Sequence, residues 1–433
     1  MKKRKLIVIS EDALVYEDTK TLMELPTFSS IWGRAAFIDR VKSIYPTVTY
    51  PCHTTMQTGL YPDRHGVVNN EQAILGERSS KWVHFRRSIA GETIFDWAKA
   101  AGMTTAAVFW PVTGCDPAID YLVDEYWPQE GESTIECFRA SGSSDEVIEK
   151  VVQPNRHLVE GKHRLHPYAD EFVNACACSM IREFQPDLLM IHPANIDGYR
   201  HQSGVFSPKV THALHEIDMW LCDLMKACED AGVLEDTDFV ITSDHGQMNI
   251  TRTVSPNVVL AENGLIDVDG DGKIKSMRAF CKSTALSSLV YVTDPTARDE
   301  VYALLCGMRD EGIYGISRVF TREEAQTEER LAGDFEFVLE SDGFSSFTND
   351  WVRPIVRSLD TGDYRFGRAT HGHLPEKGPQ PTLIAFGPHI KAGAHLAEGR
   401  IVDDAPTFAR ILGIEPPIGL DGRAVTEIIR DEE

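Results

Sequence analysis

The sequence predicts an α/β fold with a mostly parallel central sheet, helices on both faces and a smaller inserted α+β lobe. Short apolar runs of strand length alternate with stretches in which apolar residues recur at helical spacing. After residue 254 the alternation gives way to shorter strand-like runs with turns, and residues 381–386 return to an apolar strand. We therefore assign residues 1–254 and 366–433 to the α/β core and 255–365 to the lobe.

The core elements follow one another in a regular order. Strands are expected at 6–9, 104–109, 188–191 and 239–242. Helices are expected at 17–33, with an interruption near Pro26, and at 91–101, 167–184, 213–228 and 403–412. Parallel strands joined by helices bring their carboxyl ends to one edge of the sheet, where ligands bind in open α/β folds.

Residues 46–53 read Pro-Thr-Val-Thr-Tyr-Pro-Cys-His, and an extended run at 41–48 leads into them. Proline is tolerated in the first turn of a helix, so Thr49 is expected at a strand-to-helix junction, at or next to the N-cap. Gly59 would end this short helix. Threonine is a common structural cap, but a hydroxyl placed there also lies where the helix dipole stabilises anions.

Aspartate and histidine residues follow these strands or lie near the far end of the chain. Each motif alone has an ordinary structural interpretation, such as an ion pair or a surface loop. Together they offer imidazole and carboxylate ligands without thiolate, a set that suits Zn²⁺, with Mn²⁺ as the alternative. Six such ligands can hold two ions ~3.5–4 Å apart, the spacing used for in-line phosphoryl displacement. The six are Asp12, Asp197, His201, Asp244, His245 and His371.

Composition limits the partners. The net charge of −23, from 43 basic and 66 acidic residues, argues against nucleic-acid polymers. It does not exclude a small phosphorylated substrate, because bound cations invert the local field. No apolar run is long enough for a membrane span, and no signal-peptide pattern follows Met-Lys-Lys-Arg-Lys. Nine cysteines, an odd number, suit a reducing compartment, so we expect a cytoplasmic protein. The oligomeric state stays open.

Two further motifs favour ordinary structure. Residues 267–273 resemble the start of a calcium loop, but position twelve would be Arg278 instead of a bidentate glutamate, so a hairpin turn is favoured. Cys176 and Cys178 are two apart in a helix and point to different faces, which favours packing over metal binding.

The motifs together resemble the alkaline phosphatase superfamily, and within it the nucleotide pyrophosphatase/phosphodiesterase branch. That branch carries Thr-Phe-Pro-Asn-His, then Thr-Gly-Leu-Tyr-Pro-x-x-His-Gly and an asparagine. This chain has Thr-Tyr-Pro-Cys-His at 49–53, Thr-Gly-Leu-Tyr-Pro-Asp-Arg-His-Gly at 58–66, and Asn70. The branch's Phe-Trp-Pro and Ser-Asp-His-Gly motifs occur at 109–111 and 243–246. The resemblance extends over nearly the whole chain.

The resemblance implies an alkaline-phosphatase-like fold and a two-metal hydrolase. It would cleave phosphodiester or pyrophosphate bonds of a small organic phosphate such as a nucleotide derivative. One ion would be bound by Asp197, His201 and His371, and the other by Asp12, Asp244 and His245. Thr49 would be the nucleophile, forming a phospho-threonine that water hydrolyses, and Asn70 would donate a hydrogen bond to a phosphate oxygen. Tyr50 and Trp110 would offer aromatic surface to the substrate.

The chain departs from the family pattern in three respects. Ala13 stands where the family usually has glycine, and Cys52 replaces an asparagine. Members of the family are often exported, whereas this chain shows no export signal. Glu11 beside Asp12 is a competing ligand.

Three alternatives remain open. A phosphomonoesterase or phosphomutase would use the same ions, and a phosphonate hydrolase such as phosphonoacetate hydrolase would keep the metals and the threonine. A non-catalytic metal- or phosphate-binding protein is disfavoured, because all six ligands and the nucleophile are present. We expect diesters to be preferred over monoesters. The resemblance places the turn of Arg64 away from the phosphate, and the expected oxygen contact, Asn70, is a neutral donor. A basic residue of the lobe, such as Arg278 or Arg353, would overturn that preference.

Overall fold

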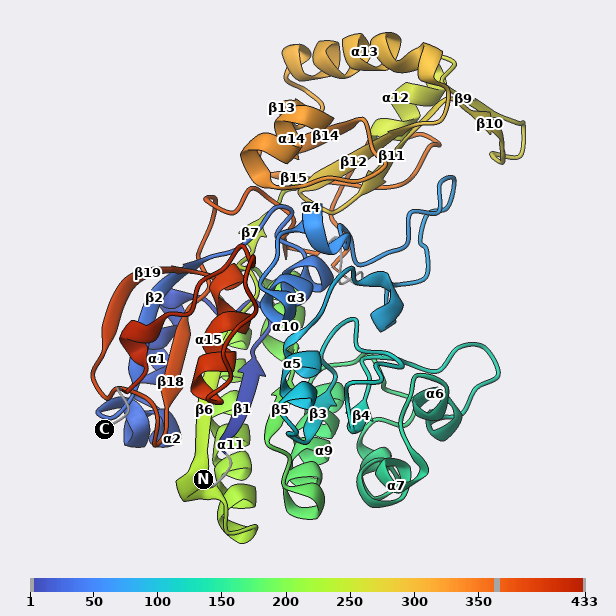
Figure 1. Ribbon diagram of the computed structural model, residues 1–433. Coiled ribbons are helices and arrows are strands. Elements are labelled where there is room, and N and C mark those ends of the chain that lie inside the picture. The colour runs from blue at the N-terminus through green and yellow to red at the C-terminus, as the bar shows by residue number, and fades with distance from the viewer. Residues whose placement is uncertain (1–3, 362–366, 431–433) are drawn as a thin grey trace.

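The computed structural model describes residues 4–361 and 367–430, and its centre is an eight-stranded sheet (Figure 1). The strands lie in the order β19 (His395–Arg400), β2 (Ala36–Lys42), β18 (Leu383–Phe386), β6 (Thr237–Thr242), β1 (Lys5–Ser10), β5 (Leu188–Ile191), β3 (Thr105–Val108) and β4 (Tyr121–Val123). All neighbours pair in parallel except β18, which is antiparallel to β2 and β6. The mostly parallel sheet expected from the sequence is confirmed.

Helices cover both faces of this sheet. On β1, Ile7 and Ile9 point into an apolar cluster with α2 (Pro26–Trp32), α9 (Tyr168–Phe184) and α11 (Pro208–Asp230). The alternate residues Leu6 and Val8 point into a second cluster with α3 (Thr49–Thr58), α5 (Ile94–Ala100) and α15 (Asp404–Ile411). A strand buried on both faces needs apolar residues at every position, which explains why its sequence does not alternate with polar residues.

The chain before Thr49 differs from the expected extended run at 41–48. β2 ends at Lys42, and the following residues are irregular. They make specific contacts instead, since the Ser43 hydroxyl donates to the Asp244 carbonyl at 2.6 Å and the Gly372 N–H donates to the Thr47 carbonyl at 2.8 Å. This segment therefore connects the loop that contains Asp244 with the loop that contains Gly372. The helical stretch predicted at 17–33 is interrupted at Pro26, as expected, where α2 begins, and its first part is divided further into η1 (Tyr16–Asp18) and α1 (Thr19–Leu22).

The lobe has its own sheet and its own core, and it stands beyond the carboxyl ends of the central strands (Figure 1). Its antiparallel sheet runs in the order β11 (Ala279–Ser283), β12 (Ser287–Val292), β14 (Phe337–Ser341) and β13 (Ile316–Thr321). Its helices are α12 (Pro256–Glu262), α13 (Arg298–Glu311) and α14 (Arg322–Glu329). β9 (Ile266–Val268) and β10 (Ile274–Met277) form a hairpin, which confirms the turn predicted at 267–273.

Short elements connect the lobe to the core. The strands are β7 (Met248–Asn249), β8 (Arg252–Val254), β15 (Ser345–Phe347), β16 (Val356–Arg357) and β17 (Ala369–Thr370). Pairing of β17 with β7 returns the chain to the edge of the central sheet just before His371.

The remaining α-helices belong to the core. They are α4 (Pro62–His65), α6 (Thr134–Ala140), α7 (Asp145–Val147), α8 (Gln153–Asn155) and α10 (Asn195–Ser203). Within the described residues, no helix combines the length and apolar character needed to cross a bilayer.

Candidate active site

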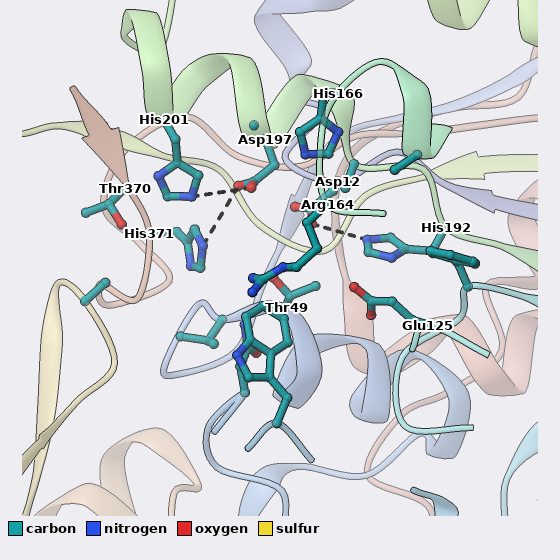
Figure 2. Close-up of a pocket in the computed structure, with 18 of the residues that line it drawn as sticks. Asp12, Thr49, Glu125, Arg164, His166, His192, Asp197, His201, Thr370 and His371 are labelled. Atoms are coloured by element: carbon teal, nitrogen blue, oxygen red, sulfur yellow. Dashed lines mark hydrogen bonds and ion pairs between the residues drawn. The ribbon is translucent and has the colours of Figure 1, made fainter. Parts of the chain in front are cut away.

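A cavity of about 320 Å³ lies at the carboxyl ends of the central strands, between the core and the lobe (Figure 2). Asp12 follows β1, His192 follows β5, and Thr49 begins α3. β1 and β5 are parallel neighbours, so the segments that follow them meet at one edge of the sheet although they are about 180 residues apart in sequence. His192 Nε2 lies 3.2 Å from Asp12 Oδ2 there. Six predicted site residues line this cavity: Asp12, Thr49, Asn70, Asp197, His201 and His371.

Asp197, His201 and His371 form one cluster suited to a metal ion, with one potential ligand atom each within 4.8 Å of the others. Asp197 and His201 are four residues apart on α10, so they share one face of the helix. The distance from Asp197 to the nearer imidazole nitrogen is 3.3 Å for His201 and 3.9 Å for His371. All three residues therefore converge on one point.

Backbone carbonyls fix the orientation of both imidazoles. His201 Nδ1 lies 2.7 Å from the Ala369 carbonyl, and His371 Nδ1 lies 3.0 Å from the Thr47 carbonyl. An N–H at Nδ1 that donates to a carbonyl leaves Nε2 as the atom that binds a metal. Burial lowers the pKa of His371 to about 4, so this ring is in the neutral form that a metal requires.

A second cluster joins Asp12, Asp197 and His245, again with ligand atoms within 4.8 Å, so that Asp197 stands in this group instead of the expected Asp244. Asp244 Oδ2 lies 3.2 Å from His245 Nε2, while its Oδ1 accepts the Ala13 and His245 N–H groups. Ala13 has a φ of 60°, a left-handed conformation that glycine adopts more easily, and this places its N–H toward Asp244. The structure thus gives a physical reason for the glycine that the family carries at this point.

Two buried carboxylates at this cluster, Asp12 and the neighbouring Asp244, each have one oxygen without a hydrogen bond among the described residues. These oxygens are Asp12 Oδ1 and Asp244 Oδ2. Burial, followed by repulsion from neighbouring carboxylates, raises the pKa of Asp12 and of Asp244 well above the usual range. Unpaired buried carboxylates are costly unless they bind a cation. The donor set therefore fits metal ions.

The competing carboxylate, Glu11, lies elsewhere. It is buried but does not contribute to the cavity lining, whereas Asp12 does. Cys52, the other departure from the family pattern, is buried beneath the site with its sulfur 3.3 Å from the Ser43 hydroxyl.

Thr49 is the first residue of α3, next to its N-cap Val48, as the sequence predicts. Its hydroxyl oxygen lies 3.3 Å from His245 Nε2. Gly59 ends the helix with a φ of 68°, in the left-handed region. The hydroxyl is thus held between the second carboxylate–imidazole cluster and the positive end of a helix.

Asn70 is held beside Thr49 by the backbone. Its Oδ1 accepts the Tyr50 N–H at 2.8 Å, which orients the amide so that its NH₂ is the group left to meet a substrate. The neighbouring residues attach this loop to the lobe. Asn69 Nδ2 donates to the Ser283 carbonyl at 3.1 Å, and the buried Lys282 ammonium lies 2.5 Å from Glu71 Oε2. The lobe therefore helps to position Asn70.

The other half of the cavity is lined by residues that the sequence analysis did not identify. They are Trp82, Glu125, Trp127, His163, Arg164, His166, Asp170 and His192. Burial raises the pKa of Glu125 to about 7. Arg164 also removes one ground for expecting diesters, because a cation does line the cavity, although it belongs neither to the lobe nor to the sequence near Thr49.

The two predicted aromatic contacts are placed differently from the other site residues. Tyr50 and Trp110 are fully buried, and neither belongs to the cavity lining. The Tyr50 hydroxyl lies 3.1 Å from His84 Nδ1, and its ring packs edge-on against Trp82. Trp110 packs edge-on against His53. Both rings support the site from beneath, whereas Trp82, Trp127 and Phe109 line the cavity.

A family model described as type I phosphodiesterase/nucleotide pyrophosphatase matches residues 6–355. An ectonucleotide pyrophosphatase/phosphodiesterase of Caenorhabditis elegans, C27A7.3, is 23% identical over 60% of this chain and 31% of its own length. The human family member 1 is 22% identical over 51% of this chain and 21% of its own length. This chain thus spans between about a fifth and a third of those longer relatives. The bis(5'-adenosyl)-triphosphatase ENPP4 of Pongo abelii is 21% identical over 95% of this chain and 78% of its own length.

The fold is also found in solved structures. Murine ectonucleotide pyrophosphatase/phosphodiesterase 5, solved as an inactive threonine-to-alanine variant in complex with AMP, superposes with a TM-score of 0.68. It is 18% identical, with 99% of this chain and 100% of that chain covered. This likeness confirms the alkaline-phosphatase-like fold class expected from the sequence. The match of the family model over most of the chain establishes that this protein belongs to the type I phosphodiesterase/nucleotide pyrophosphatase family.

Proposed function

We propose that this chain is a two-metal hydrolase that cleaves phosphodiester or pyrophosphate bonds of a small organic phosphate through a phospho-threonine. The observation that carries the proposal is the position of Thr49. Its hydroxyl lies 3.3 Å from His245, beside the buried Asp12 and Asp244, each of which has one oxygen without a hydrogen bond among the described residues. Family membership supports the reaction class.

Zinc is the proposed metal, with manganese as the alternative. The ligands in the two clusters are carboxylates and imidazoles, and no cysteine lines the described cavity. Asp197, His201 and His371 would hold one ion, and Asp12, Asp244 and His245 the other. When bound, the ions would lower the pKa of a hydroxyl oxygen and offset the charge of a phosphate.

The residues of the chain have separate tasks in this reaction. Thr49 Oγ1 attacks phosphorus and loses its proton to solvent, the bond from phosphorus to the leaving oxygen breaks, and that oxygen takes up a proton. Water then attacks phosphorus, the bond to Thr49 Oγ1 breaks, and the threonine regains a proton. Asn70 donates its side-chain N–H to a non-bridging oxygen as charge develops there. The start of α3 adds the positive end of its dipole to the same region.

The test combines metal analysis with trapping. We expect about two zinc ions per chain after purification without chelator in the presence of zinc. Brief incubation with a nucleotide diester followed by an acid quench should leave a phosphoryl group on the peptide that contains Thr49, detected by mass spectrometry. A metal-to-protein ratio near zero would refute the two-metal site. Turnover by Thr49→Ala at the wild-type rate would refute the covalent route. The non-catalytic alternative predicts binding of phosphate esters without turnover by the zinc-loaded protein.

A further inference from the structure

We propose that Arg164 is a specificity-determining residue that binds a second anionic group of the substrate, a phosphate or carboxylate beyond the reacting phosphorus. The inference rests on the proposed function and extends it, because it defines the substrate as an organic phosphate with two separated negative charges.

Arg164 is placed to reach the reacting group. It lies in the turn between η4 (Arg156–Leu158) and α9, and its side chain lines the cavity. Figure 2 shows the side chain running from this turn across the cavity toward Thr49. A group held by the guanidinium would therefore belong to the same small molecule as the phosphorus at Thr49, since the whole cavity measures only about 320 Å³.

Two tryptophans hold the guanidinium in place. Its central carbon lies 4.3 Å from the centre of the Trp127 ring and 5.1 Å from the centre of the Trp82 ring. The two rings are themselves packed edge to face at 5.2 Å. Stacking on an aromatic face fixes the plane of a guanidinium. The planar guanidinium carries its N–H groups in a fork geometry that matches a carboxylate or phosphate in a bidentate manner.

The turn that carries Arg164 is anchored to the helix that carries two metal-ligand candidates. His166 Nδ1 lies 2.7 Å from Asp170 Oδ2, and Asp170 Oδ1 accepts the N–H of Ala194, just before α10. His166 also packs on Gly198 of α10, where an added Cβ would lie 2.3 Å from the ring. This contact leaves no room for any side chain at position 198. The separation between Arg164 and the candidate metal site is therefore fixed by packing.

The charges around the cavity explain why a cation is needed there. Among the described residues that line the cavity, Arg164 is the only lysine or arginine, whereas Glu71, Glu125 and Asp170 add carboxylates outside the metal clusters. Without Arg164, an anionic group reaching beyond the metal site would meet these carboxylates. The competing structural role is charge compensation for Glu125, whose pKa Arg164 lowers against the larger raising effect of burial.

A binding experiment distinguishes anion binding by Arg164 from charge compensation for Glu125, and it does not require turnover. The zinc-loaded protein is titrated with inorganic pyrophosphate and with inorganic phosphate, and binding is followed by calorimetry and by tryptophan fluorescence. We expect wild-type protein to bind pyrophosphate at least about tenfold more tightly than phosphate, the range for one charge-assisted contact. Arg164→Gln should reduce this ratio to about one and change the phosphate affinity less than about threefold. A ratio near one in wild-type protein, or an unchanged ratio in Arg164→Gln, would overturn the proposal.

Lys162→Gln is the matched control. This residue belongs to the same turn and is exposed, but its ammonium lies 3.5 Å from the centre of the Tyr168 ring and it does not line the cavity. It removes one positive charge from the same turn without touching the guanidinium. An equal loss of preference in this variant would show that only net charge matters, which also contradicts the proposal.

Kinetics add a second measurement. For Arg164→Gln we expect kcat/KM to fall about 10- to 100-fold with ATP and less than about threefold with bis(p-nitrophenyl) phosphate, which carries one charge. Arg164→Lys should recover part of the loss, because a point charge lacks the bidentate geometry. Equal losses on both substrates would assign Arg164 a structural role. If wild-type zinc-loaded protein cleaves neither ATP nor bis(p-nitrophenyl) phosphate, the proposed function fails. The ratio of pyrophosphate affinity to phosphate affinity still decides the role of Arg164.

Discussion

The two halves of the cavity are built in different ways. Asp12, Asp244 and His245 directly follow the central strands β1 and β6, Asp197 and His201 belong to α10, and His371 follows β17. All six are buried or nearly so. The other half of the cavity comes from turns around 82, 125–127 and 163–166 and from the lobe at 283–285. Its side chains are more exposed. The candidate metal ligands are thus carried mostly by the ends of regular elements, whereas the rest of the cavity is lined largely by loops.

Among these variants, Thr49→Ala should lower the activity most. The loss of the nucleophile should reduce kcat by about 10⁴-fold or more, because the residual rate comes only from electrostatics and binding. Zinc content and melting temperature should match wild type, since the cluster ligands remain. Diester hydrolysis and zinc content are measured on the same preparation. Retention of more than a few per cent of wild-type activity would contradict a covalent role.

His371→Ala should empty one ion site and leave the other partly filled. We expect zinc per chain to fall from about two to about one, and the zinc-dependent increase in melting temperature to shrink accordingly. Elemental analysis and thermal scans with and without added zinc measure this. His395→Ala is the control, because His395 is exposed and pairs with Asp39 at the far edge of the sheet. Equal zinc content in both variants would exclude His371 as a ligand.

Asn70→Ala tests a residue whose loop is held by both the core and the lobe. The loss of one donor to a developing oxyanion should cost about 10²–10³-fold in kcat. KM should change much less, since the contact strengthens in the transition state. Steady-state kinetics on a diester separates the two parameters. A rise in KM with unchanged kcat would assign Asn70 to ground-state binding.

Lys282→Met should have the smallest effect, because this residue acts on the site only through the loop of Asn70. It leaves Glu71 without the ammonium 2.5 Å away and loosens the attachment of that loop to the lobe. We expect about a tenfold fall in kcat. In an Asn70→Ala background the same substitution should cost almost nothing, because coupled residues are not additive.

A full tenfold loss in the double variant would place the effect of Lys282 elsewhere. Lys273→Met, in the turn between β9 and β10, is the control for removing a lobe lysine, and it should leave kcat unchanged.

The sequence by itself determined the fold class and much of the candidate metal site. Continuous apolar runs such as 6–9 require a strand buried on both faces, which in turn implies helices on both sides. Ligands that follow such strands must meet at one edge, so Asp12 was predictable. His192 carried the same signal, since it directly follows the expected strand at 188–191. Glu125 lies just past β4, a three-residue strand that the apolar pattern did not indicate.

Only the tertiary structure decided which residues face the substrate. Successive residues on a helix are rotated by about 100°, so Tyr50 points into the core while Thr49 faces the cavity. No sequence pattern identifies Arg164, because its position depends on how His166 packs against Gly198 and on where Trp82 and Trp127 meet. Strand periodicity is a local property that the sequence carries directly. The approach of loops from separate parts of the chain depends on packing between elements, which local patterns do not encode.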